Sequence, residues 1–82
     1  MGQELIRDWD HMSRGEALDL ALMHAQKFLD ADRPLDAAAM LEFDLSKHTE
    51  TCDLAHEPFR RIIAVPPPER IREILRWIEG LK

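Results

Sequence analysis

The chain has 82 residues, of which 45% are hydrophobic and 33% are charged. This length allows one small domain with one modest core, and the hydrophobic fraction is too high for a disordered chain. The formal net charge of −5 is unevenly distributed: residues 1–57 contain 13 acidic and 5 basic side chains, whereas residues 58–82 contain 3 acidic and 6 basic ones. The acidic body disfavours nucleic acid as the main ligand, because phosphate contacts require clustered cations.

Cysteine usage and hydropathy indicate the compartment. Cys52 is the single cysteine, so an intramolecular disulfide is excluded and a reducing compartment is the simpler expectation. The first residues show no basic segment followed by a long apolar stretch, and the longest apolar run, residues 37–41, is too short to cross a bilayer. We therefore expect a cytoplasmic protein without membrane contact.

The first predicted element is the N-terminal segment, residues 1–12. Leu5, Ile6 and Trp9 follow helical spacing, so this segment is expected to form a short helix or an ordered arm on the core. Trp9 is interpreted as a core anchor, because the chain contains few aromatic residues that could fill that role.

A helix is predicted over residues 14–31. Ser13 and Glu16 have the spacing of a capping box, which marks its start. Its apolar side chains cover one broad arc: Ala17, Leu18, Leu20, Ala21, Leu22, Ala25, Phe28 and Leu29. His24 falls inside this arc and is interpreted as a packed core residue with one hydrogen bond.

A second helix is predicted over residues 34–48. Pro34 favours the first turn of a helix and disfavours helical geometry in the residue before it. Residues 13–48 are therefore expected to form an antiparallel helix hairpin with a short connection.

The second predicted helix carries apolar side chains on two separate faces, at about 100° per residue. One face holds Ala37, Ala38, Leu41 and Leu45, and the other holds Leu35, Ala39, Met40 and Phe43. A surface helix needs a single apolar stripe. The second face therefore predicts cover by another molecule, with Met40 and Phe43 as candidate partner-binding residues.

The C-terminal part is predicted to contain a short helix over 58–65, a proline spacer at 66–68 and a final helix over 69–81. The final helix has a narrow apolar seam: Ile71, Ile74, Leu75, Ile78 and Leu81. It is expected either to fold back on the hairpin or to reach across to a second subunit, and a homodimer is predicted. Trp77 and Ile78 complete the candidate partner-binding set. The predicted fold is one all-α domain of four or five short helices around the hairpin.

Two other kinds of site are weighed against this interpretation. His48, Cys52 and His56 recur at every fourth position and form a weak metal-ligand candidate, because the outer pair lies roughly 12 Å apart on a straight helix. Arg70, Arg72 and Arg76 form a candidate DNA contact, but glutamates alternate with them and no helix-turn-helix pattern is present. No glycine-rich phosphate loop or nucleophile elbow occurs, so neither an enzyme nor a cofactor is expected.

Residues 18–51 resemble one tetratricopeptide-type helix pair. The likeness rests on Ala25 and Phe28 in the first helix and on Ala37 and Leu41 in the second. The chain departs from that motif at three positions: His24, Asp44 and Thr49. One repeat is too few for a solenoid, so the resemblance implies a helix hairpin and is consistent with protein or peptide binding.

The size, acidity and helicity of the chain also resemble those of small phage- or plasmid-encoded proteins that inhibit host machinery, such as anti-CRISPR proteins. This resemblance implies a regulator or inhibitor that occupies a surface of a larger protein. The expected function is therefore that of a non-enzymatic interaction protein, with a DNA-associated regulator as the alternative.

Overall fold

The computed structural model describes residues 8–82 and is all-α, as the sequence predicts. Its helices are α1 (Arg14–Asp30), α2 (Pro34–Leu45), α3 (Glu57–Ile63) and α4 (Arg70–Leu81), with short 3₁₀ turns η2 (Cys52–Leu54) and η3 (Pro67–Glu69) before α3 and α4. The predicted helix or arm at Leu5 and Ile6 lies outside the described residues. None of the described helices combines the length and the hydropathy that a bilayer span requires.

The start of α1 is fixed by its capping box, and this prediction is confirmed. Ser13 Oγ accepts a hydrogen bond from the Glu16 amide at 3.1 Å, and Glu16 Oε1 accepts one from the Ser13 amide at 2.8 Å. Both bonds satisfy amides near the helix terminus that have no partner within the helix. α1 therefore begins at the predicted residue, Arg14.

The connection from α1 to α2 is a tight turn. α1 ends at Asp30, and Asp32 adopts a left-handed backbone conformation with a φ of 60°, which aspartate tolerates better than most residues. The amide of Arg33 then donates to the carbonyl of Phe28 at 2.8 Å and closes the turn. Pro34 follows as the first residue of α2, where its missing N–H leaves no helical bond unmade.

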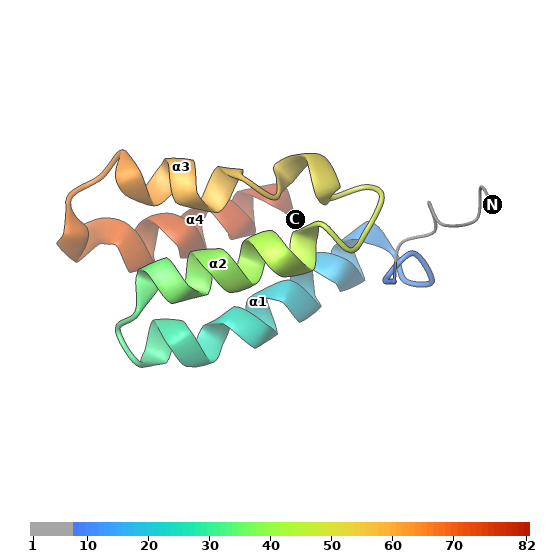
Figure 1. The fold of residues 1–82 in the computed structure, drawn as a ribbon, viewed down its shortest axis with the longest axis horizontal. Helices are drawn as coiled ribbons and strands as arrows, with labels where there is room; N and C mark the ends of the chain where they lie inside the picture. The colour runs from blue at the N-terminus through green and yellow to red at the C-terminus, as the bar shows by residue number, and fades with distance from the viewer. Residues whose placement is uncertain (1–7) are drawn as a thin grey trace.

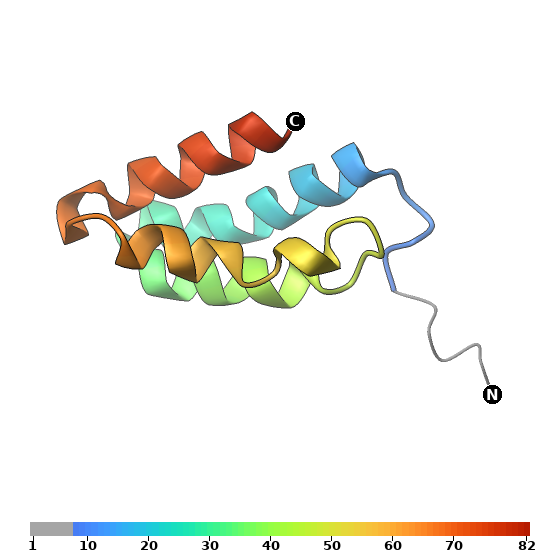
Figure 2. The ribbon, with the colours of Figure 1, turned by 90° about the horizontal axis from the view of Figure 1, so that it is seen from above.

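α2 lies between α1 and α3 (Figure 1). It runs beside α1 in the opposite direction, and α3 and α4 lie along its other sides (Figures 1 and 2). Accordingly, α2 contacts each of the other three helices. Its inward residues are almost completely buried: Ala37, Ala38, Leu41 and Leu45. Small side chains at two of these positions permit the neighbouring helices to approach closely.

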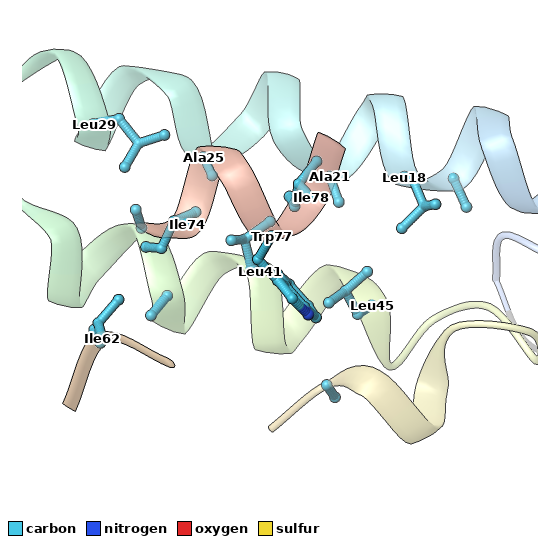
Figure 3. Packing of buried hydrophobic residues seen from close by; sticks show 14 of the residues in the cluster. Leu18, Ala21, Ala25, Leu29, Leu41, Leu45, Ile62, Ile74, Trp77 and Ile78 are labelled. Carbon is cyan, nitrogen blue, oxygen red and sulfur yellow. The ribbon is translucent and has the colours of Figure 1, made fainter. Parts of the chain in front are cut away.

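Side chains from all four helices meet in one core. Figure 3 shows the buried members that fill the space between the helices, among them Leu18, Leu41, Ile62, Ile74 and Ile78. Burying an aliphatic side chain of this size stabilises the fold by about 1.5–3 kcal/mol. Within residues 8–82, no buried side-chain nitrogen or oxygen lacks a hydrogen-bond partner. The burial of these polar atoms therefore costs little folding free energy.

α2 ends at Leu45, and the prediction that its helix continues to His48 was wrong. The buried hydroxyl of Thr51 donates to the carbonyl of Leu45 at 2.6 Å. The imidazole of His48 lies inside, 2.7 Å from the carbonyl of Met12. The helix stops because these tertiary hydrogen bonds take the place of a further helical turn.

α4 folds back on its own chain, which decides between the two arrangements that the sequence left open (Figure 2). At its end, the guanidinium of Arg14 donates to the carbonyl of Leu81 at 2.9 Å. Lys82 lies 2.7 Å from the carboxylate of Asp19, and its hydrogen bond to that carboxylate raises the pKa of the Lys82 ammonium. These contacts hold the end of α4 against the start of α1.

The two faces of α2 predict opposite responses to truncation. Leu41→Ala removes a fully buried side chain and should lower the free energy of unfolding by about 3 kcal/mol. Leu35→Ala is the matched control, because Leu35 lies on the same helix but is 51% exposed, and it should change that free energy by less than about 0.5 kcal/mol. Urea titration monitored by circular dichroism measures both, and equal losses would contradict this description.

Candidate protein-interaction surface

The apolar face of α2 that points away from the core remains uncovered in the single chain. We define this outer face by Leu35, Ala39, Met40 and Phe43. Leu35 is 51% exposed and Phe43 is 61% exposed, Ala39 is exposed, and Met40 is half-buried. Met23 of α1, which is 62% exposed, borders the face. The outer face thus carries the large exposed side chains that the two-face pattern of the sequence predicted.

Phe43 forms a ridge between two open grooves. The first groove lies toward α1 and has a volume of about 390 Å³; its lining includes Met23, Lys27, Met40 and Lys47. The second lies toward η2 and has a volume of about 520 Å³; its lining includes Ala39, Glu42, Cys52 and His56. Phe43 lines both grooves. Because both grooves open to solvent, they suit side chains of another protein better than a small substrate, which needs enclosure.

The buried carboxylate of Asp44 lies beneath the groove on the α1 side of Phe43. The side chain of Asp44 is only 2% exposed, with one oxygen 2.8 Å from Nδ1 of His24 and the other 3.7 Å from Nζ of Lys47. A buried charge needs such partners, because without them its desolvation is costly. Asp44 therefore holds both side chains in place at the base of the groove.

His24 is half-buried, and it makes the single hydrogen bond that the sequence analysis expected of it. Its ring also meets the ring of Trp9 edge-on, with the centroids 5.9 Å apart. Trp9 is buried, as predicted. Sequence reasoning missed Asp44, because an aspartate beside an apolar face is ordinarily solvated and the spacing gives no sign of its partners.

Lys47 connects this buried cluster to the exposed ridge. Its ammonium lies 4.3 Å from the centroid of the Phe43 ring and 5.2 Å from that of Trp9, distances at which a cation is attracted to an aromatic face. Its carbonyl accepts a hydrogen bond from the amide of Trp9 at 3.0 Å. Lys47 therefore contacts the exposed Phe43 ring as well as the buried Trp9.

The three candidate metal ligands have separate partners. His48 is buried, with Nε2 2.7 Å from the Met12 carbonyl and Nδ1 3.0 Å from the amide nitrogen of Glu50. Cys52 Sγ donates to the Thr49 carbonyl. His56 Nδ1 lies 2.8 Å from the carboxylate of Glu42. In residues 8–82, no three side chains from histidine, cysteine, aspartate or glutamate are placed to hold a metal ion.

The candidate DNA-contact arginines are mostly engaged within the chain. Arg70 Nε donates to the carbonyl of Ile62 at 3.1 Å, and Arg76 pairs with the buried carboxylate of Glu73. Arg72 is exposed and makes no hydrogen bond or ion pair with a described residue. These three arginines therefore do not form a free cationic cluster of the kind that binds phosphate.

Trp77 and Ile78, the other two predicted partner-binding residues, lie in the core and not on the outer face. Ile78 is 0% exposed and Trp77 is 8% exposed, and both belong to the core. The reason is that α4 packs on the rest of the chain and buries the face on which both residues lie. Of the four predicted partner-binding residues, the structure brings together only Met40 and Phe43 on an accessible surface.

Replacing the buried carboxylate tests its role beneath the surface. Asp44→Asn keeps the shape but removes the charge that pairs with His24 and Lys47, so we expect a loss of about 2 kcal/mol in unfolding free energy. Asp36→Asn is the matched control, because Asp36 pairs with Arg33 in an exposed setting on the same helix, and it should cost at most about 0.5–1 kcal/mol. Chemical denaturation measures the difference; equal effects would contradict a structural role of Asp44.

Comparison of the chain with protein-family models, with curated proteins and with solved structures finds no match. The likeness to a tetratricopeptide-type helix pair and to small host-inhibitor proteins therefore remains an expectation from the sequence. The features of the surface that bear on function are its exposed apolar residues and the two flanking grooves.

Proposed function

We propose that this chain is a non-enzymatic protein-interaction module that binds protein through the outer face of α2, and that it acts as a small regulator or inhibitor. The observation that carries the proposal is the 61% exposure of Phe43 between two grooves, one of which it shares with the exposed Met23, on a face that also carries the exposed Leu35. Exposed apolar side chains that gather on one face are typical of protein interaction sites.

The surroundings of Phe43 have the composition of a protein interface. Aromatic and methionine side chains are enriched at the centre of interfaces, whereas the rims are polar. Here Phe43 lies between the two grooves and shares one of them with Met40, while Lys27 lines that groove and Glu42 the other. A partner that covers Phe43 would remove a large apolar surface from water, which is the main source of association free energy.

A second exposed residue provides a contrast. Ile63 on α3 is 69% exposed, which is more than Phe43, but it lines none of the described grooves. Single exposed apolar residues are common and need no functional explanation. The proposal therefore rests on clustering and shape, and exposure alone would not distinguish the two residues.

Site-specific photo-crosslinking tests the proposal. Phe43 is replaced by benzoylphenylalanine, which keeps an aromatic ring at the ridge, and the variant is irradiated in cells that naturally produce the chain. We expect protein adducts in high yield from position 43, because a bound protein would cover this ring. Mass spectrometry of the adducts identifies the captured protein, whether it is a larger partner or the chain itself.

The same group placed at position 63 is the matched control. It presents the same reactive ring at a more exposed site outside the outer face, so it should give at least about tenfold fewer adducts if burial in an interface governs the yield. Equal yields from the two positions, or no adducts from position 43, would show that the outer face does not bind protein.

A further inference from the structure

We propose that the occupant of the outer face is a second copy of this chain. The α2 helices of the two copies pack side by side and point in the same direction, and the two-fold axis runs between them, parallel to both helices. This inference rests on the proposed function and names the partner. It follows from three features of the face: the spacing of its apolar side chains, the small size of Ala39 in the middle of the face, and the opposite charges at its two edges.

The first two features make the face able to pack against itself. Leu35, Ala39 and Phe43 recur at four-residue intervals, so they form one ridge along α2. Ala39, the middle residue of the three, is small, so two helices can approach closely between the larger Leu35 and Phe43 side chains. In a two-fold contact the same patch is used by both copies. With the axis along α2, Leu35, Ala39 and Phe43 each meet their own equivalent in the second copy.

The third feature is the charge difference between the two edges. Lys27 lines the groove on the α1 side, contacts the ring of Phe28, and forms no ion pair with a described carboxylate. Glu42 lines the groove on the η2 side, where its described ionic contact is the highly exposed His56. Each copy therefore offers a cation on one edge of the ridge and a carboxylate on the other.

The orientation of the two-fold axis decides which edges meet. An axis along α2 places the α1 side of one copy against the η2 side of the other, which forms two symmetric Lys27–Glu42 pairs. An axis across α2 places each edge against its own equivalent and brings lysine toward lysine. Like charges in close contact disfavour association, so the charges select the parallel arrangement.

The size of the face sets the expected strength. α2 has 12 residues and is therefore about 18 Å long, so the interface is at the small end of specific protein contacts. We expect a weak, reversible dimer that is populated at high micromolar concentrations.

Charge reversal with analytical ultracentrifugation tests the arrangement, using the purified chain up to about 1 mM. Lys27→Glu and Glu42→Lys should each weaken self-association by about tenfold or more, because each places two pairs of like charges in contact. An equimolar mixture of the two variants should recover association to within about threefold of the original chain, because both pairs are then opposite in sign. Phe43→Ser should abolish the dimer.

The two reversals also separate local pairing from overall charge. Lys27→Glu changes the formal net charge from −5 to −7, whereas Glu42→Lys changes it from −5 to −3. If net repulsion governed association, the second variant would strengthen the dimer, and this result would overturn the proposed pairing. Arg72→Glu on α4 is the matched control, with the same charge change as Lys27→Glu at an exposed position away from the face, and it should have little effect. Circular dichroism verifies that each variant folds.

Failure of this inference differs from failure of the proposed function. A chain that stays monomeric at about 1 mM, or variants whose mixture does not recover association, would overturn the parallel dimer. If position 43 still crosslinked to a different protein, the outer face would remain a protein-binding surface. If it crosslinked to nothing, both proposals would fall.

Discussion

The packing of α2 against three other helices is the constraint on which this fold depends. α1, α3 and α4 all contact α2, and its inward residues are almost completely buried. A chain of 82 residues has few elements with which to cover every side of a helix. Three neighbours cover the inward part of its circumference, and the remaining part carries Leu35, Ala39 and Phe43 into solvent. The exposed face is thus a consequence of how the core is assembled.

Polar contacts fix the loops and ends around this core. Thr51 and His48 end α2 by bonding to backbone carbonyls, and Arg14 and Lys82 attach the end of α4 to α1. In a small core, an unpaired buried polar group would cost a large part of the total stability. The complete pairing of buried side-chain polar atoms among residues 8–82 is therefore as important to this fold as the apolar contacts.

Polar contacts also position the side chains of the outer face. Asp44 is buried on the side of α2 that faces α1, and it holds Lys47 where this cation lies against Phe43. An aromatic side chain that is already held in place loses less conformational entropy when a partner covers it. The ordered ridge, with one groove on each side, is the feature on which the proposed protein binding rests.

The all-α class, the start of α1 and the two-faced character of α2 could be predicted because they depend on local patterns. The spacing of Ser13 and Glu16 predicts a capping box, and the fixed backbone angle of Pro34 predicts the first turn of a new helix. Helical periodicity likewise separates Leu41 from Phe43. These signals involve residues within a few positions of one another, so no knowledge of the other helices is needed to interpret them.

Only the tertiary structure decided that the apolar seam of α4 is buried within the chain and which polar groups lie inside. Trp77 and Ile78 have the same local pattern whether α4 packs on its own chain or on another. The packing of α4 on α1, α2 and α3 places them in the core. The burial of Asp44 and the early end of α2 at Leu45 depend on His24 and Thr51, whose proximity arises from folding. Periodicity fixes the angle of a side chain around its own helix axis, but burial depends on what lies opposite, and that is set by the packing of the whole chain.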